Sequence, residues 1–132
     1  MTKNDRLRSV RVLVVDDDKD TREMLRFILK QAGADASAAG SVTEAFEKYK
    51  TAPPDVVVSD IGMAENNGYA LIALIRAHDQ EFGRSTPAIA LTAYTSPADR
   101  ETALAAGFQR YMSKPFDPRE IIEEIREMVS VR

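Results

Sequence analysis

The sequence contains no cysteine and only one histidine, His78, among its 132 residues. The absence of cysteine excludes disulfides, thiolate zinc sites and cysteine nucleophiles, and it is typical of proteins in a reducing compartment. One histidine is too few for a histidine metal cluster, and its position in a helical segment predicts that it faces solvent. Any metal site must therefore rely on oxygen ligands.

Long apolar runs and blocks of one charge are also absent. No run approaches the roughly 20 residues of a membrane-spanning helix, and the first residues lack the apolar stretch of a signal peptide. The 18 basic and 21 acidic residues nearly balance, without a basic block of the kind that binds nucleic acid. We expect a cytoplasmic segment that binds neither membrane nor nucleic acid.

Two kinds of segment alternate from about residue 10 onward. The apolar runs that predict strands are residues 10–15, 34–39, 55–59, 87–91 and 108–112. Each is followed by apolar residues at helical spacing. Strict alternation predicts an α/β fold with five parallel strands and helices on both faces of the sheet. Residues 1–9 are predicted to be a polar tail or linker, and 10–132 one domain.

Capping residues and apolar periodicity locate individual helices. Ser41 and Glu44 have the spacing of a capping box, which predicts a helix start. In the helix that follows the loop at residues 66–68, the spacing of Leu71, Leu74 and Ile75 predicts the buried face.

Chemically active residues terminate four of the expected strands. In a parallel sheet these ends share one edge, where ligands bind at the reversal of strand order. Carboxylates held so close repel and either take up a proton or recruit a cation. Oxygen ligands without histidine or cysteine favour Mg²⁺, which commonly contacts phosphate oxygens. The residues are Asp16, Asp17, Asp60, Thr92 and Lys114.

These residue types suit phosphoryl transfer. An aspartate can attack phosphorus to form an acyl phosphate, while a metal, a lysine and a hydroxyl stabilise charge on the transferring group. Each residue alone has a plainer explanation, since Asp60 could start a loop and Thr92 could end a strand. Their convergence at one sheet edge outweighs these explanations. Asp18 is assigned to helix capping rather than to the site.

The ordered motifs resemble the receiver domains of two-component signalling over roughly residues 10–130. Any one motif is weak, but the ordered set is highly specific. The resemblance, which includes chemotaxis regulators, implies a flavodoxin-like doubly wound (βα)5 sandwich with strand order 2-1-3-4-5. The motifs are Val-Val-Asp-Asp at 14–17, Asp60 after a valine-rich strand, Gly68, Leu-Thr-Ala at 91–93, Ala-Ala-Gly at 105–107 and Lys-Pro-Phe at 114–116.

The resemblance also implies how the metal and the acceptor are arranged. Asp60 would be the phosphoacceptor, Asp17 a direct Mg²⁺ ligand, and Asp16 a ligand through water. Gly62 would offer its backbone carbonyl to the metal. The family usually has proline where this chain has Ala64; alanine does not fix φ, so a looser loop with retained phosphorylation is expected.

The remaining site residues would sense the phosphoryl group. Thr92 would hydrogen-bond a phosphoryl oxygen, Lys114 would pair with the group, and a cis bond from Lys114 to Pro115 would aim the lysine. Tyr111 would change rotamer as Thr92 moves. The signal would then reach the face formed by the helix after residue 96, the strand at 108–112 and the helix after Pro118.

This reading predicts a signalling switch with only self-directed phosphotransfer and dephosphorylation, not an enzyme acting on a diffusible substrate. A sensor histidine kinase or a phosphotransfer domain would supply the phosphoryl group, because His78 lies in no phosphoacceptor-like motif. A downstream protein, or a second copy in a phosphorylation-dependent dimer, would read the output. The sequences of residues 59–63 and 91–94 most resemble those of receivers in hybrid sensor kinases. This favours the interpretation that the chain is part of a larger protein over the interpretation that it is a stand-alone regulator.

Two alternatives stay open on the sequence. A haloacid dehalogenase-type phosphatase also uses an aspartyl phosphate and Mg²⁺, and residues 16–18 supply its Asp-x-Asp motif. The acceptor strand, however, is better matched by the segment Asp60-Ile61-Gly62, which lacks the second acid of that motif. A degenerate receiver that is never phosphorylated would act only through contacts. Retention of all five site residues argues against it.

Overall fold

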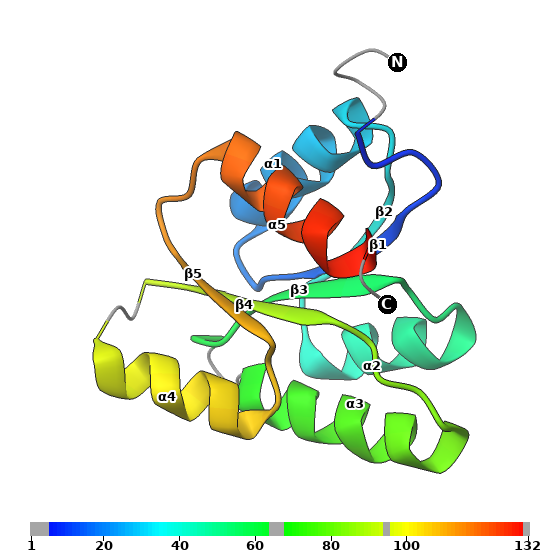
Figure 1. The fold of residues 1–132 in the computed structure, drawn as a ribbon, viewed down its shortest axis with the longest axis vertical. Helices are drawn as coiled ribbons and strands as arrows, with labels where there is room; N and C mark the ends of the chain where they lie inside the picture. Colours follow the sequence, from blue (N-terminus) through cyan, green and yellow to red (C-terminus); the bar gives the residue numbers. More distant parts are fainter. Residues whose placement is uncertain (1–5, 64–67, 94–95, 131–132) are drawn as a thin grey trace.

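The computed structural model describes residues 6–63, 68–93 and 96–130, in which five strands and five helices alternate (Figure 1). The strands are β1 (Arg11–Val15), β2 (Asp35–Ala39), β3 (Val56–Asp60), β4 (Ala88–Thr92) and β5 (Arg110–Ser113). The helices are α1 (Lys19–Gln31), α2 (Val42–Thr51), α3 (Gly68–Phe82), α4 (Pro97–Ala106) and α5 (Pro118–Ser130).

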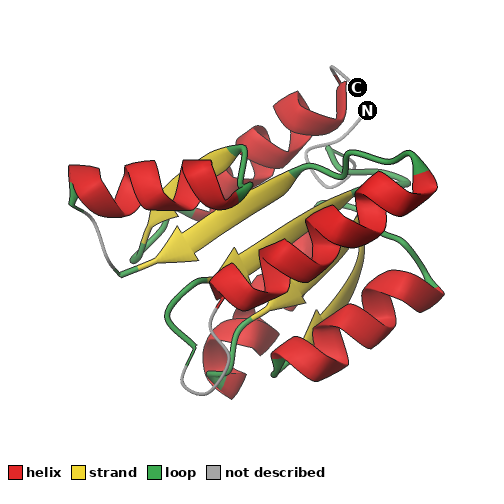
Figure 2. Cartoon of the chain, turned by 90° about the horizontal axis from the view of Figure 1, so that it is seen from below, coloured by secondary structure: helices red, strands yellow, loops and turns green. Residues whose placement is uncertain are grey.

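The strands form one parallel sheet in the order β2-β1-β3-β4-β5, and their arrows point the same way in Figure 2. The predicted fold class and strand order are therefore confirmed. Strand boundaries agree to within two residues, and the largest difference is at β5, which begins at Arg110 instead of residue 108. Within the described residues, no helix combines the length and apolarity needed to cross a bilayer.

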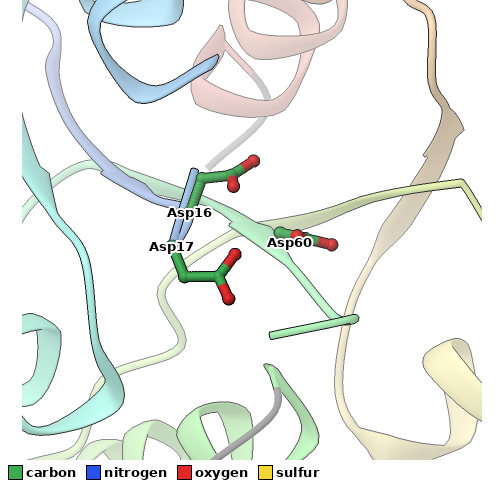
Figure 3. A group of neighbouring side chains, drawn as sticks. All are labelled: Asp16, Asp17 and Asp60. Atoms are coloured by element: carbon green, nitrogen blue, oxygen red, sulfur yellow. The ribbon is translucent and has the colours of Figure 1, made fainter. Parts of the chain in front are cut away.

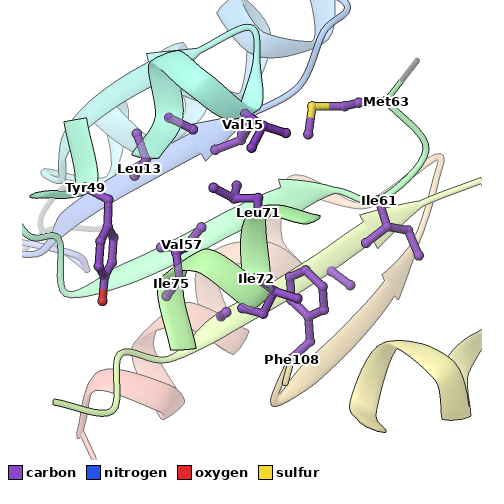
Figure 4. Packing of buried hydrophobic residues seen from close by; sticks show 14 of the residues in the cluster. Leu13, Val15, Tyr49, Val57, Ile61, Met63, Leu71, Ile72, Ile75 and Phe108 are labelled. Carbon is purple, nitrogen blue, oxygen red and sulfur yellow. The ribbon is translucent and has the colours of Figure 1, made fainter. Parts of the chain in front are cut away.

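Helices cover both faces of the sheet, with α1 and α5 on one face and α2, α3 and α4 on the other (Figure 1). Alternate residues of a strand point to opposite faces. Val12 and Val14 accordingly pack in the cluster under α1 and α5, whereas Leu13 and Val15 pack in the cluster shown in Figure 4. Burial on both faces explains why the strands read as continuous apolar runs.

The predicted cap at α2 is present. The Ser41 hydroxyl accepts a hydrogen bond from the N–H of Glu44 at 3.1 Å. The Glu44 carboxylate in turn accepts from the N–H of Gly40 at 2.8 Å, one residue before the position expected for a capping box. Two donors at the helix entrance are thereby satisfied.

The buried face of α3 differs from the prediction at one position. Leu71 and Ile75 are buried as expected, but Leu74 is 42% exposed and Ile72 is buried in its place. Ile72 lies toward the end of α4, because a Cβ added to Gly107 would lie 3.3 Å from Ile72 Cγ1. The apolar stripe is therefore rotated toward the neighbouring helix, which periodicity alone does not reveal.

Two further expectations need correction. Leu7 lies in the segment predicted to be a polar tail, yet it is fully buried in the cluster under α1 and α5, and its N–H donates to the carbonyl of Ala32 at 2.7 Å. His78 does not face solvent freely. It is half-buried between α2 and α3, where its ring contacts Phe46, Tyr49 and Phe82 at centroid distances of 5.9, 5.6 and 4.6 Å.

Candidate functional site

Three carboxylates meet at the carboxyl ends of β1 and β3 (Figure 3). Asp16 and Asp17 follow β1, Asp60 is the last residue of β3, and each offers an oxygen within 4.8 Å of the others. The register explains the meeting, because Val15 of β1 pairs with Ser59 of β3 one residue earlier. Neighbouring parallel strands thus deliver these acids to one place.

Asp16 is the buried member of the cluster, with 1% of its surface exposed. Its Oδ1 accepts from the N–H of Asp18 at 2.9 Å, and its Oδ2 accepts from Nζ of Lys114 at 2.8 Å. Burial raises the pKa of the Asp16 carboxyl, and these hydrogen bonds offset the increase only in part. Both oxygens of Asp16 are therefore engaged by the protein.

Lys114 links Asp16 to the acceptor strand. Its Nζ also lies 3.4 Å from Oδ2 of Asp60, and its backbone N–H donates to the Thr92 carbonyl at 2.8 Å. The predicted cis bond to Pro115 is present. Burial by itself would lower the pKa of Lys114, but the hydrogen bonds and negative charges of Asp16 and Asp60 outweigh it and raise that pKa. The amine is therefore held as an ammonium ion.

Asp60 is more accessible than Asp16, with 12% of its side chain exposed. Its Oδ1 accepts from the N–H of Gly62 at 2.9 Å. The start of α3 lies against the same segment, since a Cβ on Gly68 would lie 2.6 Å from the Asp60 carbonyl oxygen and 2.7 Å from Ile61 Cα. Only glycine allows this close approach of backbones.

Thr92 lies on β4, which neighbours the acceptor strand, and Tyr111 lies on β5, the next strand beyond it. Thr92 ends β4 and is fully buried, one position beyond the pair formed by Leu91 and Asp60. Tyr111 lies on β5, packs against the cluster between the sheet and α2, α3 and α4, and its buried hydroxyl has no hydrogen-bond partner among the described residues. The sheet therefore brings the five side chains predicted at the strand ends to one end of the sheet, and Tyr111 lies near that end.

Two neighbours of the cluster complete its surroundings. Asp18 occupies the N-cap position of α1, as expected, but its side chain makes no capping hydrogen bond to the helix backbone; its carboxylate accepts from the Thr21 hydroxyl at 2.6 Å instead. Sequence reasoning missed Arg22, whose Nη1 donates to the backbone carbonyl of Asp16 at 3.0 Å. The only sequence feature that could have indicated this contact is the position of the basic residue, one turn into the helix that follows the acidic end of β1. Ala64 lies outside the described residues.

The sequence model of the response regulator receiver domain family matches residues 12–126, most of the chain. This chain is a receiver domain. It is 43% identical over 116 residues to an uncharacterized 14.6 kDa protein in the sodA1 3′ region of Leptolyngbya boryana, covering 88% of this chain and 87% of that protein. The family match establishes the receiver domain as a component of two-component signalling.

The chain is also similar to a DNA-binding response regulator in sequence and to a chemotaxis protein in structure. It is 34% identical over 116 residues to the DNA-binding response regulator MtrA of Mycobacterium tuberculosis, covering 88% of this chain and 49% of MtrA. The receiver domain thus spans about half the length of that relative. The structure of the Vibrio cholerae chemotaxis protein CheY4 superposes with a TM-score of 0.84 and 30% identity, covering 91% of this chain and 98% of CheY4.

Proposed function

We propose that Asp60 is the phosphoacceptor and takes its phosphoryl group from a phosphohistidine on a sensor histidine kinase or a phosphotransfer domain. The observation that carries the proposal is the position of the Asp60 carboxylate, which is 3.4 Å from the Lys114 ammonium and beside two further carboxylates. A carboxylate oxygen of Asp60 attacks phosphorus and forms an O–P bond. The P–N bond breaks, and its electron pair stays on the imidazole nitrogen.

The acidic cluster fits Mg²⁺ because every donor is a carboxylate oxygen and the three groups lie within 4.8 Å of one another. Asp17 is exposed and would serve as a direct ligand, whereas Asp16, both of whose oxygens accept hydrogen bonds from the protein, would act through water. Asp60 and the Gly62 carbonyl would complete the protein ligands. When bound, Mg²⁺ neutralises charge on the phosphoryl oxygens.

Lys114 and Thr92 act on the phosphorylated state. The ammonium of Lys114 is already within 3.4 Å of Asp60 and would pair with the phosphoryl group, while the Thr92 hydroxyl would hydrogen-bond one of its oxygens. Movement of Thr92 would free space for the Tyr111 ring, whose hydroxyl is buried without a partner among the described residues. The α4–β5–α5 face would then change its binding of a downstream protein or of a second copy.

This assignment describes a switch in the cytoplasm with self-directed chemistry and no diffusible substrate. It is favoured over a phosphatase because the family match is to receiver domains. It is favoured over a receiver that is never phosphorylated because a partly exposed acceptor, a charged lysine and two further carboxylates are all brought together.

Intact-mass spectrometry after incubation with acetyl phosphate and Mg²⁺ tests the acceptor. The wild-type chain should gain one phosphoryl group, with a label that is stable in acid and labile in base, and Asp60→Asn should gain none. Asp55→Asn is a matched control, because Asp55 precedes the same strand at the opposite end of the sheet and its carboxylate accepts from the N–H of Arg11. Labelling that survives Asp60→Asn would contradict the proposal.

The metal assignment has its own test. Asp17→Ala should abolish Mg²⁺-dependent labelling of Asp60, because the direct carboxylate ligand is gone. Unchanged labelling of this variant would show that Asp17 is not a metal ligand.

A further inference from the structure

Arg22 connects α1 to the acidic end of β1. Its Nη1 donates to the Asp16 backbone carbonyl at 3.0 Å. The guanidinium also lies against Gly40 at the end of β2, where an added Cβ would be 2.7 Å from Nη1 and 3.3 Å from Cζ. Arg22 therefore occupies the space that a side chain at position 40 would fill.

The carbonyl that accepts this bond belongs to the peptide plane joining Asp16 to Asp17. A peptide unit is rigid, so a hydrogen bond to its oxygen fixes the orientation of the whole plane. Rotation of this plane would change ψ of Asp16 and φ of Asp17, and it would redirect the Asp17 carboxylate. Asp16 is also held through its own N–H, which donates to the Ala39 carbonyl at 3.2 Å.

We propose that Arg22 is a positioning residue for Mg²⁺ binding: by holding the Asp16 carbonyl, it keeps the Asp17 carboxylate directed at the site it shares with Asp60. Arg22 contacts neither the ion nor the phosphoryl group. The inference rests on the proposed function, because it concerns the same metal site.

Charge and positioning predict opposite effects of removing Arg22. A guanidinium near the acids repels a divalent cation, so loss of its charge alone would tighten Mg²⁺ binding. Loss of the anchored peptide would weaken binding, because a ligand group with more orientational freedom must be ordered when the ion binds. The sign of the change in affinity therefore distinguishes the two.

Calorimetric titration of the full chain with Mg²⁺ alone measures this sign. Arg22→Gln should weaken binding by about tenfold, the lower end of the effect of losing an outer-shell partner of a metal ligand. Arg26→Gln is the matched control, since Arg26 lies one turn further along α1 and its Nε donates to the Ala36 carbonyl at 3.3 Å. It loses the same charge and should bind Mg²⁺ as tightly as wild type or slightly more tightly.

Gly40→Ala tests positioning while keeping the Arg22 charge. The new methyl group meets only the end of the Arg22 side chain, which can move, so the fold should persist while the bond to Asp16 is lost. We expect the same weakening as in Arg22→Gln, and no further weakening in the double variant Arg22→Gln/Gly40→Ala. This variant also carries the test if Arg22→Gln fails to fold.

Mg²⁺ affinity in Arg22→Gln or Gly40→Ala that equals or exceeds that of wild type would overturn the inference. Failure of the proposed function looks different. A wild-type chain that binds Mg²⁺ but is not labelled at Asp60 would overturn the proposed acceptor and leave the role of Arg22 testable, whereas a wild-type chain that binds no Mg²⁺ would overturn both proposals.

Discussion

The ammonium of Lys114 lies 2.8 Å from the buried carboxylate of Asp16, although 98 positions separate the two residues in the sequence. In the sheet, two strands lie between β1, which Asp16 follows, and β5, which precedes Lys114. The pair therefore forms only when the complete sheet is assembled. The buried charge of Asp16 is thus compensated by the charge of Lys114, while its other oxygen accepts from the N–H of Asp18.

Lys114→Met should destabilise the metal-free protein, because it leaves the Asp16 carboxylate buried without its cation. We expect a loss of about 1–3 kcal/mol in the free energy of unfolding, measured by urea denaturation in the presence of a chelator. Asp16→Asn should suppress much of this loss in the double variant, since no buried charge then remains. Additive effects of the two substitutions would contradict a coupled pair.

Gly68→Ala should disturb the acceptor strand. The added Cβ would lie 2.6 Å from the Asp60 carbonyl oxygen, which is backbone and cannot move aside cheaply. We expect a loss of stability above about 2 kcal/mol together with reduced labelling of Asp60. Gly83→Ala is the control, because φ is +68° there but nothing lies within 4 Å. It should cost about 1 kcal/mol and leave labelling intact.

Leu7→Ala tests whether the folded unit begins before residue 10. Leu7 is fully buried, so truncation should lower the free energy of unfolding by about 2–5 kcal/mol in urea denaturation. Arg8→Ala removes an exposed neighbour and should change it by less than about 0.5 kcal/mol. Equal effects of the two substitutions would mean that Leu7 does not belong to the core.

A buried polar network at the other end of the sheet gives the protein a predictable response to alkaline pH. The Tyr49 hydroxyl donates to the Asp79 carboxylate and lies 2.7 Å from the Thr86 hydroxyl. Burial, followed by the bond to Asp79, raises the pKa of Tyr49 to about 12. Because the pKa in the unfolded chain is about 10, only the unfolded state loses this proton between about pH 10 and 12.

The free energy of unfolding of the wild-type protein should therefore fall as pH rises through this window, and that of the Tyr49→Phe variant should fall less steeply. The difference between the two slopes should approach about 1.4 kcal/mol per pH unit. Urea denaturation of both proteins at pH 9, 10 and 11 measures it, and titration of lysines and other tyrosines is common to both. Parallel curves would show that Tyr49 titrates normally in the folded state.

Much of the fold follows from local sequence patterns. Valine-rich runs, the cap at Ser41 and strict alternation predict a doubly wound parallel sheet, and the motif resemblance predicts its strand order. Because such a sheet gathers its carboxyl strand ends at one edge, the sequence alone predicts that Asp16, Asp60 and Lys114 lie together.

Other features depend on contacts between segments that sequence periodicity does not encode. The sequence does not show that α4 covers Ile72 and leaves Leu74 exposed, nor that His78 lies among the aromatic rings of α2 and α3. Leu7 is one apolar residue in a polar stretch, so only the packing of α1 and α5 reveals its burial.

By itself, the sequence determined the fold class and the chemical types at the site, because both follow from the order of strands and the residues that end them. Only the tertiary structure decided that Lys114 engages Asp16 more closely than Asp60, and that Arg22 reaches the Asp16 carbonyl across the space left by Gly40. These relationships depend on side-chain direction and backbone approach, which are fixed when helices and strands pack together.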